Sequence, residues 1–99
     1  MAQITWTSEA QQWLRDIFDY IAKDNPTAAD SVISGIYRRV QILLTFAQAG
    51  HLYREEPEGE IRVLLYGHYR IAYLLHKNAN KIEVLGIFHG AMEIDRYLE

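Results

Sequence analysis

Residues 61–90 carry a hydrophobic pattern typical of three short strands. Apolar runs cover residues 61–66, 69–76 and 81–88, and short polar or glycine-containing connections separate them. Gly67 lies in the first connection, where its tolerance of positive φ suits a hairpin turn. Strands joined by such short connections can pair only antiparallel. We therefore predict a three-stranded antiparallel meander.

Alternation of side chains divides each predicted strand between two faces of the sheet. In the middle strand, one face is strongly apolar and must be covered, whereas the other is mixed and contains Arg70. In the third strand, strict alternation places Phe88 on the same face as Val84, and Ile87 on the opposite face. The sheet is thus predicted to have one covered face and one partly open face.

Two stretches before the meander repeat apolar residues at helical spacing. A first helix is predicted over residues 8–23, with Ser8 opening a capping box. A second is predicted over residues 26–49, because Asn25 can cap it and Pro26 suits its first turn. The connection is so short that the two helices must form an antiparallel hairpin, which would cover the apolar face. Gly35 inside the second helix costs about 1 kcal/mol relative to alanine, and a close approach of the first helix would explain it.

The remaining segments complete a single α+β domain over residues 1–99. Residues 2–6 are predicted as an N-terminal strand whose partner stays open, residues 51–60 as a polar loop, and residues 91–99 as a short C-terminal helix. The predicted core consists of Trp13, Ile17, Ile21, Val32, Ile36, Val40, Leu43, Ile71, Tyr73 and Val84.

The meander and the C-terminal segment hold more apolar residues than a two-helix hairpin can readily cover. The residues that compete for this cover are Leu64, Leu74, Leu85, Ile87, Phe88, Met92, Ile94 and Leu98. A contiguous exposed apolar surface usually marks a site of protein interaction. A sheet edge can also accept an added strand from a disordered peptide.

Composition and charge narrow the classes of function. The chain has 99 residues, 49% of them hydrophobic, no cysteine and a net charge of −3, and its sequence pI is about 5.8. The negative charge argues against nucleic-acid binding driven by overall charge. The histidines lack the spacing of a metal site, and we expect no cofactor. Without an apolar run of about 20 residues or a signal peptide, we expect a cytoplasmic protein without a membrane span.

Three stretches, taken in order, resemble the RelE/ParE superfamily of toxins from type II toxin–antitoxin systems. They are YIAKDNPTAA at residues 20–29, YRIAY at residues 69–73 and IFHG at residues 87–90. The resemblance implies the RelE/ParE fold. RelE-like members are ribosome-dependent mRNA endonucleases, whereas ParE-like members bind and poison DNA gyrase. It also implies neutralisation by an antitoxin whose disordered C-terminal segment wraps the toxin.

The resemblance also suggests residues for each activity. Arg70 occupies the position of a central-strand arginine, Arg62 a basic position on the preceding strand, and Tyr97 the position of a C-terminal aromatic residue of the nuclease branch. His89 is a further candidate for proton transfer because its ordinary pKa would suit that role. These four residues would be catalytic only in an RNase.

Two positions favour the binding branch of the superfamily, or a toxin fold that has lost its activity, over the nuclease branch. Leu64 stands where the nuclease branch has a second lysine, and Ala91 stands where an arginine is usual. The favoured hypothesis is therefore a ParE-like growth inhibitor that binds DNA gyrase and is held by an antitoxin. The alternatives are a RelE-like enzyme acting on mRNA at the ribosome, and a toxin fold that has lost its activity. Without an antitoxin, self-association into a homodimer through the same surface is a further alternative.

For the favoured hypothesis, the residues expected to contact the target or the antitoxin are Arg62, Arg70, Phe88, Met92, Ile94 and Tyr97. Arg62, Arg70, His89 and Tyr97 each also have a purely structural interpretation. Arg70 could pair with Glu83 or another carboxylate across the sheet, and Arg62 could be a solvated strand residue. His89 could be structural at its strand end, and Tyr97 could be a packing residue of the last helix.

Overall fold

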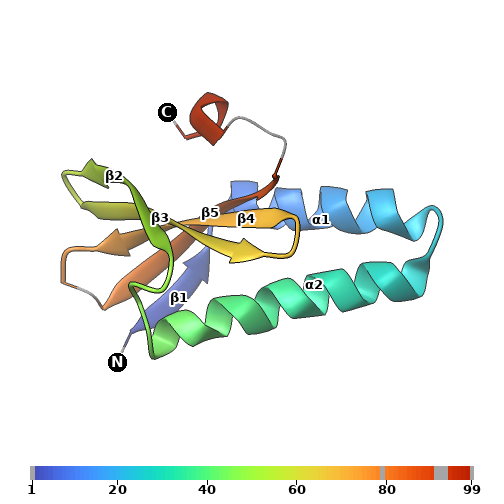
Figure 1. Ribbon diagram of the computed structural model, residues 1–99, viewed down its shortest axis with the longest axis horizontal. Coiled ribbons are helices and arrows are strands. Elements are labelled where there is room, and N and C mark those ends of the chain that lie inside the picture. The colour runs from blue at the N-terminus through green and yellow to red at the C-terminus, as the bar shows by residue number, and fades with distance from the viewer. Residues whose placement is uncertain (1, 79, 91–93, 99) are drawn as a thin grey trace.

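The computed structural model describes residues 2–78, 80–90 and 94–98. In chain order its elements are β1 (Gln3–Trp6), α1 (Ser8–Ala22), α2 (Pro26–Gln41), the 3₁₀ turn η1 (Ile42–Leu44), β2 (His51–Glu56), β3 (Gly59–Tyr66), β4 (Tyr69–His76), β5 (Lys81–His89) and the 3₁₀ turn η2 (Ile94–Arg96). Figure 1 shows the α1–α2 hairpin against the sheet, with its far end extending beyond the strands. The α+β prediction is confirmed.

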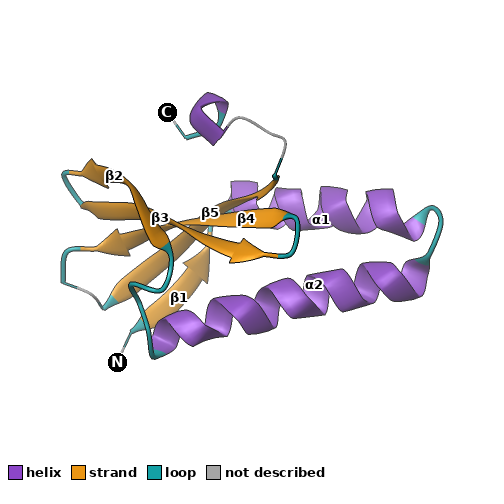
Figure 2. Cartoon of the chain, viewed as in Figure 1, coloured by secondary structure: helices purple, strands orange, loops and turns teal. Residues whose placement is uncertain are grey.

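The five strands form one mixed sheet in the order β1-β5-β4-β3-β2 (Figure 2). The three predicted strands pair antiparallel as expected. The partner of the N-terminal strand, which the sequence left open, is β5. The two strands run parallel, with Gln3 opposite Lys81 and Trp6 opposite Val84. The helical hairpin therefore lies in the connection that returns the chain from β1 to the sheet.

The prediction of a polar loop over residues 51–60 is wrong, because most of this segment forms β2 and the start of β3. The two strands pair antiparallel, and a register shift lies between Leu52 and Arg54. Strand β2 has only one neighbour. An edge strand needs no continuous apolar face, and charged residues with an irregularity protect such an edge from further pairing. The polar composition that suggested a loop is thus the composition of an edge strand.

Both helices begin at the predicted residues, Ser8 and Pro26, but the cap of α1 and the end of α2 differ from the prediction. Helix α1 is capped by Thr7 rather than Ser8: the Thr7 hydroxyl accepts a hydrogen bond from the Ala10 N–H at 3.1 Å. The same hydroxyl lies 3.1 Å from the Val84 carbonyl oxygen, to which it can donate, so the cap ties the helix start to β5. Helix α2 ends at Gln41, well before residue 49, and η1 follows it. The chain leaves the helix there and turns back toward the sheet.

Tyr73 holds this returning segment. Its hydroxyl donates to the Ala47 carbonyl oxygen at 2.8 Å and accepts from the Gly50 N–H at 3.0 Å. Gly50 lies so close to the Tyr73 ring that a Cβ there would come within 2.8 Å of it. The close contact of Gly35 is likewise with the sheet rather than with α1. A Cβ at Gly35 would overlap the hydroxyl of Tyr66 on β3.

An irregularity in β5 changes the predicted faces. Ala72 pairs with Gly86 and Tyr73 with Val84, so Leu85 is an extra residue between them. Such a bulge shifts the alternation by one position. As a result Ile87 belongs to the core on the side of the helices, whereas Phe88 belongs to the core on the opposite face. The predicted placement of Phe88 with Val84 is therefore wrong.

The sheet separates two cores. The larger lies under the helical hairpin and consists of Ala10, Leu14, Ile36, Val40, Leu43, Leu64, Ile71, Tyr73, Leu75, Ile82, Val84 and Ile87. Of the predicted core residues, Trp13, Ile17 and Val32 are only partly buried against it, and Ile21 is also of intermediate exposure. The remaining six are buried, so the predicted hairpin face is confirmed.

The smaller core lies on the other face and consists of Ile61, Val63, Ala72, Leu74, Phe88, Ile94 and Leu98. The C-terminal segment supplies two of these residues and so covers apolar side chains that were expected to be exposed. The described part of this segment forms the 3₁₀ turn η2, and the predicted C-terminal helix is not found there. Met92 lies outside the described residues.

Candidate binding surface

Arg62 is held by its own domain. Its side chain is 15% exposed, and its Nε donates to Glu60 Oε1 at 2.9 Å. Its Nη1 donates to the carbonyl oxygens of Gly50 at 2.7 Å and Gln48 at 3.3 Å. The interpretation of Arg62 as a solvated strand residue is therefore wrong. This arginine fastens the loop before β2 to β3.

Arg70 lies at the other end of the sheet, where its Nη2 donates to the Gly90 carbonyl oxygen at 3.3 Å. It does not pair with Glu83, because Arg70 lies opposite Phe88 whereas Glu83 lies opposite Leu74. Glu83 instead contacts His76, with 2.7 Å between Oε1 and Nε2. The pairing of Arg70 with Glu83 is therefore wrong.

His89 and Arg70 line the same shallow hollow at the end of the sheet. This hollow has a volume of about 530 Å³ and also includes His68 and Tyr69. The ring of His89 stacks near that of His68, with centroids 6.3 Å apart, and meets the Tyr69 ring edge-on at 5.9 Å. The Gly90 N–H donates to the His68 carbonyl oxygen at 2.7 Å, which ties the β3–β4 turn to the end of β5.

The predicted arginines do not share a surface. Arg62 lies opposite Tyr73, whose side chain faces the helical hairpin. Arg70 alternates with Ile71 of the same core and therefore projects from the opposite face. Three positions of β3 further separate Arg62 from the partner of Arg70, which is Leu65. A single charged surface built on both arginines is not present in this fold.

Tyr97 of the C-terminal segment packs in an aromatic cluster with Trp13 of α1 and Phe88 of β5. Its ring stacks on Phe88 with centroids 5.4 Å apart and meets Trp13 edge-on at 5.3 Å. Trp13 also meets Phe88 edge-on at 5.1 Å. Phe88 and Ile94 are 1% and 4% exposed, whereas Tyr97 is 47% exposed. Of these three expected contact residues, only Tyr97 offers a large surface to a partner.

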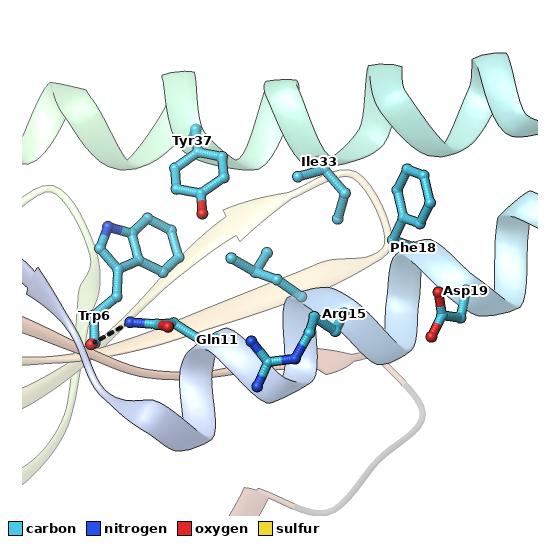
Figure 3. Close-up of a pocket in the computed structure, with 8 residues that line it drawn as sticks. Trp6, Gln11, Arg15, Phe18, Asp19, Ile33 and Tyr37 are labelled. Atoms are coloured by element: carbon cyan, nitrogen blue, oxygen red, sulfur yellow. Dashed lines mark hydrogen bonds between the residues drawn. The ribbon is translucent and has the colours of Figure 1, made fainter.

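A second hollow, which the sequence interpretation missed, lies between the two helices beside β1 (Figure 3). Its volume is about 400 Å³, and its lining consists of Trp6, Gln11, Leu14, Arg15, Phe18, Asp19, Ile33 and Tyr37. We call it the hairpin groove. The apolar side chains of the two helices point toward one another across it, and Arg15 and Asp19 of α1 lie along it.

Local contacts fix the aromatic wall of the hairpin groove. The rings of Trp6 and Tyr37 lie 4.7 Å apart and are tilted by 51°. Gln11 Nε2 donates to the Trp6 carbonyl oxygen at 3.3 Å, which holds the end of β1 against α1. Tyr37 is 43% exposed, although it faces a second helix. The sequence signal that could have revealed this groove was Phe18 and Tyr37, which are aromatic residues beside the main apolar stripe of each helix.

The titrating tyrosines of the sheet have structural roles. Burial raises the pKa of Tyr73. The hydrogen bond from the Gly50 N–H and the charge of Arg62 lower this pKa, but by less than burial raises it. Burial also raises the pKa of Tyr69, and Tyr20 adds to this effect. A raised pKa keeps both hydroxyls neutral, so neither is activated as a nucleophile.

The described residues offer no metal centre and no membrane helix. Within residues 2–78, 80–90 and 94–98, no group of three or more histidine, aspartate and glutamate side chains could hold a metal ion. No helix in this part of the chain is both long and apolar enough to cross a membrane. The clearest chemical feature is the hairpin groove, whose partly exposed aromatic rings suit a protein partner.

Comparison with known proteins is consistent with this geometry. No match was found among curated proteins. The fold is similar to a chromosomal ParDE toxin–antitoxin system from P. aeruginosa, with a TM-score of 0.73 and 24% identity over 90% of this chain and 96% of that one. It is also similar to the RelBE2 toxin–antitoxin complex from Mycobacterium tuberculosis, with a TM-score of 0.57 and 18% identity over 89% and 96%. Residues 4–94 match the model of the ParE toxin of the type II toxin–antitoxin system parDE. The chain therefore belongs to the ParE toxin family of type II toxin–antitoxin systems.

Proposed function

We propose that this protein inhibits bacterial growth by binding DNA gyrase and that a cognate antitoxin neutralises it. The observation that carries this proposal is that the four residues a nuclease would need do not gather at one site, because only Arg70 and His89 line a common hollow. Arg62 is bound within its own domain, and Tyr97 packs in the aromatic cluster on the second face of the sheet. Phosphoryl transfer requires cations and a proton-transfer group around one phosphate, so this dispersal favours action by binding.

The antitoxin contact is best placed at the hairpin groove. Its apolar lining, formed by residues such as Trp6, Phe18 and Ile33, suits the apolar face of a partner segment. Binding there would bury the exposed ring of Tyr37 and the partly exposed rings of Trp6 and Phe18, and it would stabilise the fold by mass action. Without the antitoxin, two copies could cover the same groove, which makes a homodimer the competing occupant.

One substitution pair tests this contact. Tyr37 lines the groove, and Tyr20 is a helical tyrosine outside it that is 77% exposed. After co-expression with the product of the adjacent gene, we expect Tyr37→Ala to reduce co-purification about tenfold or more, as for an aromatic contact residue. Tyr20→Ala should leave it unchanged. Equal effects of the two substitutions would contradict the placement, and a dimer with no bound antitoxin would favour self-association.

The proposed target is tested by expressing the protein alone in bacteria. We expect DNA replication to stop before translation, and the purified protein to inhibit supercoiling of relaxed plasmid by gyrase. Growth without any inhibition, at normal levels of folded protein, would favour a toxin fold without activity.

A second candidate is the RelE-like endonuclease, and one observation favours it. Arg70 and His89 line one hollow at the end of the sheet, together with His68. A cation and imidazole groups near one another could serve a phosphate and a proton transfer. Mapping of mRNA ends after expression would decide: codon-specific cleavage in the ribosomal A site would replace the gyrase proposal with this one.

A further inference from the structure

A hollow of about 460 Å³ lies on the face of the sheet opposite the hairpin core. Its apolar floor is formed by Ile61, Leu74, Leu85 and Phe88, and the C-terminal residues Tyr97 and Leu98 form its other side. Trp13 on α1 completes the lining near the aromatic cluster described above. The hollow is distinct from the hairpin groove, with which it shares no lining residue.

The charges around this hollow are predominantly negative. Among the described residues that line it, three carboxylates, those of Glu9, Glu56 and Glu58, accompany one cation, Arg54. Arg54 is already engaged: its Nε lies 2.6 Å from Glu56 Oε1, and its Nη2 donates to the Leu98 carbonyl oxygen at 2.5 Å. Glu9 and Glu58 are both exposed, and neither forms an ion pair with a described cation.

An apolar, aromatic floor with a carboxylate rim is complementary to a long cationic side chain. The methylene stem of arginine or lysine covers apolar surface while its head group stays at the rim. Aromatic faces attract the same cation, and a carboxylate adds a charge-assisted hydrogen bond. An anionic ligand would be repelled by Glu9 and Glu58, and a purely apolar ligand would make no use of either carboxylate.

We propose that this acidic-rimmed hollow receives an arginine or lysine side chain of the antitoxin, flanked by apolar residues that cover the floor. The inference rests on the proposed antitoxin partnership and adds to it the chemistry of a second contact. Arg54 has a positioning role, because it holds both Glu56 and the C-terminal segment that borders the hollow.

Tryptophan resonances offer a direct test with small probes. The chain has two tryptophans: Trp13 lines this hollow and Trp6 lines the hairpin groove. In titrations followed by the indole N–H signals in NMR spectra, acetyl-Leu-Arg-Leu-amide should shift Trp13 and leave Trp6 in place. The matched peptide with citrulline, which has the shape of arginine without its charge, should bind about tenfold more weakly. Equal affinity of the two peptides, a shift of Trp6 alone, or no shift with either would overturn the inference.

Charge-removing variants locate the site. Glu9→Gln and Glu58→Gln should each weaken binding of the arginine peptide about threefold, in the range of exposed ion pairs. Asp30→Asn, an equal change of charge at an exposed position of α2 outside the hollow, should have no effect. Because all three side chains are exposed, thermal unfolding should show that each variant is folded. Unchanged affinity in the double variant Glu9→Gln/Glu58→Gln would also overturn the inference. Failure of the gyrase or growth assays would not affect these peptide results, so the two proposals fail separately.

Discussion

Replacing Tyr73 with phenylalanine should reveal how strongly the sheet holds the returning segment between α2 and β2. The Tyr73 side chain is fully buried, and its hydroxyl bridges the Ala47 carbonyl oxygen and the Gly50 N–H. Phenylalanine keeps the ring and removes only this bridge. The loss includes the net contribution of two hydrogen bonds, about 0.5–1.5 kcal/mol each.

Gly50 is buried, so its N–H would lose its partner in a site with little access to water. A buried polar group left unpaired costs about 1–3 kcal/mol, part of which the two hydrogen-bond terms already contain. We therefore expect the free energy of unfolding to fall by about 2–3 kcal/mol. For a domain of this size, each kcal/mol lowers Tm by about 4–8 °C, so the expected decrease is roughly 8–24 °C.

The assay is urea unfolding followed by circular dichroism, with Tyr37→Phe as the matched control. Tyr37 is 43% exposed, and its hydroxyl should contribute less than about 0.5 kcal/mol. Arg62 donates to the carbonyl oxygen of the same Gly50. The variants Tyr73→Phe and Arg62→Ala should therefore be non-additive in a double-mutant cycle. A loss below about 0.5 kcal/mol in Tyr73→Phe would refute the bridging role.

Three further predictions concern the core, the alkaline limit of stability and the exposed end of the sheet. Ile36→Ala should reduce the free energy of unfolding by about 2–5 kcal/mol, because Ile36 is fully buried. A loss of less than about 1 kcal/mol in chemical denaturation would mean that the buried face of α2 is assigned wrongly. Burial raises the pKa of Tyr73 in the folded state, so the folded state retains a proton that the unfolded state loses above pH 10. Stability should therefore be complete below about pH 10 and decline as pH rises through that value. In Tyr73→Phe the decline should be shallower, and an unchanged pH dependence would show that Tyr73 is not the group responsible. Arg70→Ala should relieve growth inhibition at a nearly unchanged Tm, whereas Arg62→Ala should lower Tm because it releases the loop before β2. Full toxicity of folded Arg70→Ala would refute a target-binding role for Arg70.

Local sequence patterns predicted the elements that bury a regular apolar face. The period of the two helices and the alternation of the three meander strands follow from backbone geometry alone. Ile36, Val40 and Ile71 were therefore recognised as core residues, and their burial agrees. The order of two helices followed by a meander also carried the resemblance to the RelE/ParE superfamily, which the family match confirms.

Patterns of this kind failed where an element's neighbours decide its conformation. Strand β2 has the composition of a loop, and only pairing with β3 makes it a strand. The bulge at Leu85 occurs where β4 and β5 must stay in register while Thr7 bonds to the backbone of β5. The early end of α2 accompanies the contacts of Tyr73 with a segment more than twenty residues away. None of these distant contacts leaves a local periodic signal.

The candidate site shows the same division. The sequence by itself identified Arg62, Arg70 and His89 as residues with suitable chemistry, and it determined that the sheet would have one face covered by a helical hairpin. Only the tertiary structure decided that Arg62 is bound inside the domain, that Arg70 projects from the other face, and that aromatic side chains of β1, α1 and α2 form a groove. The physical reason is that residue type sets what a side chain can do, whereas burial, hydrogen-bond partners and strand register are set by residues distant in the chain.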